Sequence, residues 1–112
     1  DMPGNIVDSL FRFVALKDGW PVSNNVRMTM KDHQLTSLSI NGQSLDVNKT
    51  YKAAVPDYVA NGGDNTRFMI GLKRIQTGLL VRNILVQYAA ETARAGNDIN
   101  VGLQGRITIQ PQ

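Results

Sequence analysis

The sequence has no cysteine, a single histidine and no long apolar run. The absence of cysteine excludes disulfides, a thiol nucleophile and thiolate metal sites, and it leaves the redox compartment open. The apolar runs are far shorter than the roughly 20 residues that a membrane span needs, and the N-terminus lacks the order of a signal peptide. We therefore expect a soluble chain without a membrane span, whose targeting signal, if it has one, lies outside this sequence.

Basic residues are present in modest excess but are scattered along the chain. Twelve Lys and Arg stand against nine Asp and Glu, for a formal net charge of +3. A nucleic-acid footprint would need a basic cluster, so we expect no nucleic-acid partner. The 112 residues fit one domain, because a chain of this size buries roughly two thirds of its unfolded surface.

Two segments have the apolar spacing of helices. The first covers residues 5–14, where Asn5 can cap the first turn. The second covers residues 77–95, with Thr77 as a possible cap and Gly96 as the stop. The second helix carries a stripe at the spacing i, i+3, i+4, i+7. Its members are Val81, Ile84, Leu85, Tyr88, Ala89 and Thr92.

Other segments alternate apolar and polar residues, as strands with one buried face do. Residues 26–31, 38–40, 43–45, 50–55 and 104–110 follow this pattern to different extents. Asn41-Gly42 favours a two-residue hairpin turn because both residues accept a positive φ. We predict an α+β fold with a mixed or antiparallel sheet and about two main helices.

Catalytic residues are sparse in this sequence. His33 lies in a polar turn between two strands, without a second ligand or a nucleophile near it in sequence. We interpret it as a solvated turn residue and predict neither a catalytic residue nor a metal ligand in this chain.

The segment 54–65 combines the end of a strand, an aromatic residue and a pair of glycines. Gly62 and Gly63 let the backbone take a positive φ and come close to a ligand. Asp64 can then direct a carboxylate into the space beside Tyr58. An aromatic face contributes about 1–3 kcal/mol per stacked base, and a carboxylate accepts hydrogen bonds from ribose hydroxyls.

A plainer interpretation stays open for the same segment. Tyr58 could pack in the core while Gly62 and Gly63 only turn a corner. Trp20, in a Gly-Trp-Pro loop, also has two interpretations, because it can anchor the loop in the core or present a ring to a ligand. The local pattern therefore ends at a candidate pocket.

The same residues resemble the C-terminal domain of the 5′-nucleotidases, in which a strand and an aromatic precede a stretch close to Asn-Gly-Gly-Asp. The hairpin 39–46, the strand 49–55 and the closing segment 103–107 are similar to that domain in the family's order. The likeness covers about residues 17–110, and we assign the whole of 1–112 to one such domain, with the start of the domain missing.

This resemblance implies a binding site with assigned roles. Trp20 and Tyr58 would sandwich the nucleobase, and Asp64 would bind the ribose hydroxyls. Asn61, Gly62 and Gly63 would shape the loop. The family places its two metal ions and its catalytic His and Asp residues in an N-terminal domain that no part of this chain matches. The two divalent metals are therefore expected in a separate domain or partner chain, and none in this chain.

Three departures from the family pattern concern the site itself. Val22 stands where many members carry a polar residue that contacts the base, and Asn65 replaces a common glycine. The arginine-bearing segment that meets the substrate is also absent.

The resemblance implies a nucleotide- or nucleoside-binding part of a phosphohydrolase, located in the periplasm or at the cell surface. This chain would lack the dimetal catalytic site. The alternative is a degenerate binding or assembly module that kept the fold and lost the hydrolytic role.

Overall fold

The computed structural model describes residues 1–63, 66–99 and 102–111. The chain divides into two compact units. The first unit consists of Asp1–Lys73 together with Gln104–Gln112, and the second consists of Arg74–Leu103. The α+β class predicted from the sequence is confirmed, because the first unit combines a helix with sheet.

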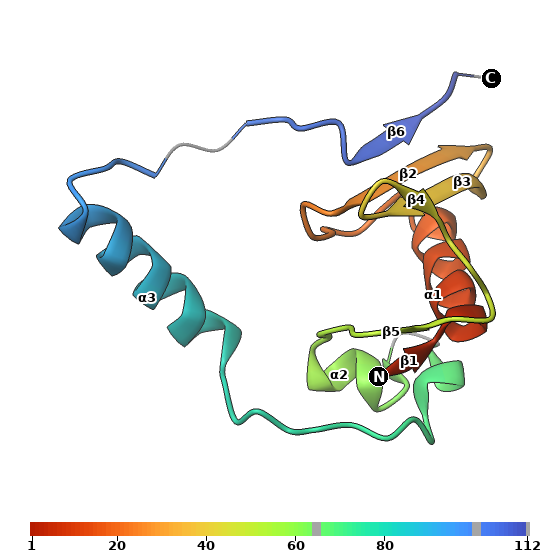
Figure 1. Ribbon diagram of the computed structural model, residues 1–112, viewed down its shortest axis with the longest axis horizontal. Coiled ribbons are helices and arrows are strands. Elements are labelled where there is room, and N and C mark those ends of the chain that lie inside the picture. The colour runs from red at the N-terminus through yellow and green to blue at the C-terminus, as the bar shows by residue number, and fades with distance from the viewer. Residues whose placement is uncertain (64–65, 100–101, 112) are drawn as a thin grey trace. The chain divides into compact units, whose positions relative to one another are not determined.

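The first unit is built on a four-stranded mixed sheet. Its strands are β2 (Val26–Lys31), β3 (Gln34–Ile40), β4 (Gln43–Ser44) and β6 (Ile107–Ile109), in the order β4-β3-β2-β6. β2 pairs antiparallel with β3 and parallel with β6, so the C-terminal strand lies beside β2 at one edge (Figure 1). The predicted strand at 26–31 is confirmed, and the one at 104–110 is shortened to three residues.

Tight turns join the three consecutive strands. Asn41 and Gly42 have φ values of 55° and 78°, as a type I′ hairpin requires, and the predicted turn is confirmed. Asp32 and His33 take similar values of 52° and 63° between β2 and β3. These turns give β3 an antiparallel neighbour on each side.

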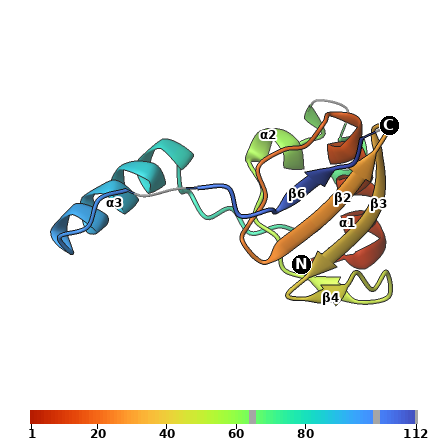
Figure 2. The ribbon, with the colours of Figure 1, turned by 90° about the horizontal axis from the view of Figure 1, so that it is seen from above.

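Helix α1 (Gly4–Leu16) packs against the sheet and closes the core. Figure 2 shows it behind β2 and β3. The buried apolar residues of the first unit are Met2, Val7, Val14, Ala15, Val26, Met28, Met30, Leu38, Val59 and Met69. The alternating pattern of β2 buries Val26, Met28 and Met30 on one face, as the period of two predicts.

The start of α1 differs from the prediction. Pro3, not Asn5, is the N-cap residue, and no side chain caps the first turn. The Gly4 amide instead donates to the Lys49 carbonyl at 2.6 Å, so a tertiary contact satisfies a free helix amide.

The predicted strand at 50–55 is wrong in length. The structure has β1 (Met2–Pro3) paired antiparallel with β5 (Thr50–Tyr51), a ladder of two residue pairs. In this register Pro3 pairs with Thr50 and Met2 pairs with Tyr51, and among the described residues the ladder does not continue past Tyr51.

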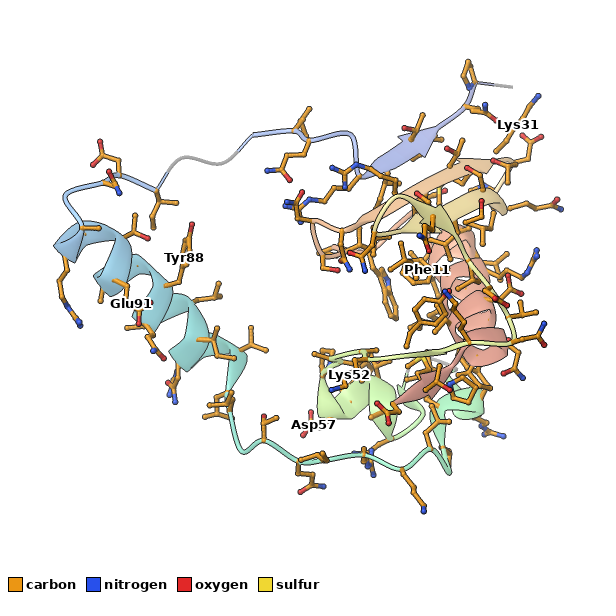
Figure 3. All side chains as sticks on the ribbon, viewed as in Figure 1. Phe11, Lys31, Lys52, Asp57, Tyr88 and Glu91 are labelled. Atoms are coloured by element: carbon orange, nitrogen blue, oxygen red, sulfur yellow. The ribbon has the colours of Figure 1, made fainter. Side chains whose placement is uncertain are left out.

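The second unit contains α3 (Val81–Arg94). The helix begins at Val81 with Leu80 as its N-cap residue, so Thr77 as the cap was wrong; the Thr77 hydroxyl accepts from the Leu79 amide instead. The predicted stop is confirmed: Gly96 has φ of 76°, and the amides of Gly96 and Asn97 donate to Ala93 and Thr92 carbonyls. None of the helix residues is buried, and Tyr88 and Glu91 project from it (Figure 3).

Among the described residues, no helix combines the length and apolar character needed to cross a membrane.

Candidate functional site

Helix α2 (Asp57–Ala60) presents Tyr58 to solvent. Pro56 fixes the extended backbone before the helix, and the Asp57 carboxylate accepts from the Tyr58 amide at 2.7 Å. The Tyr58 side chain is 58% exposed, whereas Val59 is only 6% exposed and packs in the core. The interpretation in which Tyr58 packs in the core is therefore wrong, because this single turn of helix uses Val59 as its buried contact.

The turn after α2 has room only for glycine. Gly62 has φ of 86°, and an added Cβ at Gly63 would lie 2.5 Å from Tyr58 Cε2 and 2.7 Å from the Tyr58 carbonyl oxygen. The close approach holds the Tyr58 ring against the backbone of Gly63. Asn61, at the end of α2, is exposed. Asp64 and Asn65 lie outside the described residues.

Thr66 is a polar residue of this loop that sequence reasoning missed. It is fully buried, and its hydroxyl lies 2.8 Å from the Val59 carbonyl oxygen and 2.6 Å from that of Gly63. The threonine stands three residues after the second glycine in an otherwise polar stretch, so the sequence alone contained no signal of burial.

Trp20 is a half-buried anchor in the structure. Its ring meets Phe13 of α1 edge-on, with the centroids 5.1 Å apart, and Phe13 also contacts Phe68 at 6.4 Å. Phe68 belongs to η2 (Arg67–Met69), which follows the Gly-Gly turn. Phe13 therefore joins the Trp20 loop and the Gly-Gly segment in one aromatic cluster, and the anchor interpretation of Trp20 is confirmed for the face that packs inward.

The loop that carries Trp20 is held by the C-terminal segment of the chain. The Arg106 guanidinium donates to the Val22 carbonyl at 2.7 Å, and it also donates twice to the Gln104 side-chain oxygen. Gly19 lies against Ile107 of β6, since a Cβ there would be 3.3 Å from the Ile107 side chain. Arg106 is 84 positions from Val22, so spacing in the sequence could not pair them.

His33 is an exposed turn residue, as predicted, but it has a partner. Its Nδ1 lies 2.7 Å from Asp18 Oδ1, and both side chains are more than half exposed. The part of the chain that the structure describes contains no group of three or more His, Cys, Asp or Glu residues able to hold a metal ion.

A cavity of about 430 Å³ lies away from the Gly-Gly turn, beside α1 and strands β2 to β4. Hydroxyl side chains of β2, β3 and β4 line it, together with an ion pair between Asp8 and Arg12 at 2.8 Å. The hydrogen bond and charge of Asp8 raise the pKa of Arg12. Trp20, Tyr58 and the glycine pair do not line this cavity, so it is separate from the predicted site.

Comparisons with known proteins match the segment that contains the predicted site. Residues 17–71 match the family described as 5′-nucleotidase, C-terminal domain. The chain is also 38% identical over 68 residues to Protein UshA from Salmonella pullorum. This match covers 57% of the chain and 12% of the relative, so the chain spans only a small part of that protein's length.

Proposed function

We propose that this chain is the nucleotide- or nucleoside-recognition part of a 5′-nucleotidase-like phosphohydrolase, because residues 17–71 match the family described as 5′-nucleotidase, C-terminal domain. The observation that carries the proposal is the exposed ring of Tyr58, held against Gly63 in the family's matched segment. We extend the assignment to the whole of 1–112 as one domain.

In the proposed site, the nucleobase stacks on Tyr58. Stacking on one aromatic ring contributes about 1–3 kcal/mol, and it tolerates different bases because each has a π face. Trp20 supplies the second ring with the part of its side chain that Phe13 does not cover. Asp64 accepts hydrogen bonds from the ribose hydroxyls, while Asn61, Gly62 and Gly63 give the loop its shape.

The contribution of this chain to hydrolysis would be to hold and orient the substrate. Fixing the base places the phosphate ester in a defined position, and such positioning lowers the entropic part of the barrier. A separate domain or partner chain, with two divalent metals, supplies the catalytic groups. We propose that the assembly lies in the periplasm or at the cell surface, as the family resemblance implies.

The test is a titration of the chain with adenosine, AMP and uridine, followed by tryptophan fluorescence with excitation at the red edge and by calorimetry. Trp20 is the single tryptophan, so its emission reports on one position. We expect saturable binding that Tyr58→Ala weakens about 5- to 150-fold, as the loss of about 1–3 kcal/mol from one stacked base predicts. Asp64→Asn should weaken binding of all three ligands, since each contains ribose. Trp20→Phe, followed by calorimetry, tests the second ring separately.

Tyr88→Ala is the matched control. Tyr88 lies on α3 and is 56% exposed, close to the 58% of Tyr58, so its loss should leave binding unchanged. Equal effects of the two tyrosine variants would contradict the proposed site. Absence of binding at millimolar ligand would instead favour the alternative of an assembly module, which the exposed apolar stripe of α3 supports.

A further inference from the structure

Thr66 is a buried polar side chain in the core of the first unit. It has no solvent exposure, although the residues around it in sequence are polar or exposed. A buried hydroxyl is costly unless it finds a hydrogen-bond partner. The Thr66 hydroxyl has two acceptors within reach, the carbonyl oxygens of Val59 and Gly63.

These two carbonyls stand at the two sides of the turn that follows α2. Val59 is in the helix, at the residue after Tyr58, and Gly63 is the residue against which the Tyr58 ring packs. The Thr66 amide also donates to the Gly63 carbonyl at 3.2 Å. The Thr66 side chain therefore contacts both the helical end of the turn, at Val59, and its glycine end, at Gly63.

The short helix needs such support. α2 has four residues, and an isolated single turn of helix is unstable in water because its nucleation is unfavourable. Its backbone bonds are those of a single turn: the amides of Val59 and Ala60 donate to the Pro56 carbonyl, and the amides of Asn61 and Gly62 donate to the Asp57 and Val59 carbonyls. The position of Tyr58 thus depends on contacts outside the helix, namely the buried Val59 side chain and the Thr66 hydroxyl.

We propose that Thr66 is a positioning residue for the nucleobase site: its hydroxyl fixes the turn so that Tyr58 is held in place before the ligand binds. This inference rests on the proposed function, since it assigns the fixed ring to base stacking. A loop that is already ordered loses less conformational freedom when the ligand binds. A turn fixed in advance therefore raises the affinity for the ligand.

Two substitutions separate positioning from simple filling of the core. Thr66→Val keeps the shape but removes the hydroxyl, so the two carbonyls lose a donor. Thr66→Ser keeps the hydroxyl but removes a methyl group. If Thr66 only fills space, valine should be the better replacement and serine the worse one. If the hydroxyl positions the turn, the order is reversed.

The experiment measures adenosine and AMP affinity by calorimetry, together with amide hydrogen exchange across residues 57–63. We expect Thr66→Val to weaken the binding of adenosine and of AMP about 3- to 10-fold, which is the effect of losing one net hydrogen bond. It should also accelerate exchange of the Asn61 and Gly62 amides. Thr66→Ser should stay within about twofold of the wild-type affinity.

Thr92→Val is the matched control, because the Thr92 hydroxyl donates to the Tyr88 carbonyl at 2.8 Å on α3. This variant loses a hydroxyl-to-carbonyl bond in the second unit and should leave affinity unchanged. The inference would be overturned if Thr66→Val kept wild-type affinity and exchange, or if Thr66→Ser lost as much as Thr66→Val. A wild-type chain that binds neither ligand would overturn the proposed function, while faster exchange in Thr66→Val would still assign the turn to Thr66.

Discussion

At the scale of single residues, Tyr58 and Gly63 are packed so closely that position 63 has no room for a methyl group. An alanine Cβ would meet both the ring and the carbonyl oxygen of Tyr58, and the carbonyl cannot move aside without shifting α2. We expect Gly63→Ala to lower the free energy of unfolding by about 1–3 kcal/mol, as overpacking does. Urea denaturation followed by circular dichroism measures the change.

Gly102→Ala is the control for the effect of replacing a glycine. Nothing lies within 4 Å of a Cβ added there, and Gly102 is not among the glycines with positive φ. It should unfold like the wild type. A Gly63→Ala variant of unchanged stability would show that Tyr58 and α2 move freely at this position.

Residues that act through neighbours in sequence were predictable, and those that act through distant contacts were not. The Gly-Gly pair and the aromatic before it have a local signature, because positive φ favours glycine. The exposure of Tyr58 was left open, since a one-turn helix can bury either Tyr58 or Val59. Thr66 gave no signal, because its hydroxyl bonds only to backbone carbonyls.

At the scale of elements, β6 and the residue before it hold the Trp20 loop. The Arg106 carbonyl accepts from the Met28 amide, while its guanidinium donates to the Val22 carbonyl. We expect Arg106→Gln to lower the free energy of unfolding by about 1–3 kcal/mol, the cost of leaving a partly buried carbonyl without its charged donor. Trp20 emission should shift to the red as the loop loosens. Fluorescence spectra and urea denaturation measure both effects.

Arg82→Gln removes the same charge from an exposed position on α3 and serves as the control. It should change neither the emission nor the stability. Arg106→Lys should restore only part of the effect, because an ammonium cannot reach Val22 and Gln104 in the same planar geometry. Unchanged emission in Arg106→Gln would contradict the assigned role.

Elements whose sequence alternates regularly between apolar and polar residues were predicted well. Elements whose length depends on the strand they pair with were not. β2 and the turn at Asn41-Gly42 were predicted correctly because neighbouring residues alone determine the apolar–polar alternation of a strand and the positive φ values of a hairpin turn. The strand at 50–55 was too long because β1, its partner, supplies only two residues. The parallel pairing of β6 with β2 joins residues 107–109 to residues 28–30, and no local pattern indicates it.

At the scale of the whole molecule, stability should come from the first unit. Its buried residues include Met28 at 1% exposure, whereas Leu85 on α3 is 63% exposed. We expect Met28→Ala to cost about 2–5 kcal/mol of unfolding free energy. Leu85→Ala should change it by less than about 0.5 kcal/mol, as surface substitutions do. Both are measured by urea denaturation, with Trp20 emission reporting on the first unit and circular dichroism on the whole chain.

The stability of Leu85→Ala also tests whether the apolar stripe of α3 is covered, because amphipathic helices normally bury such a face. A Leu85→Ala variant that loses as much stability as Met28→Ala would mean that this stripe is covered when the protein is folded.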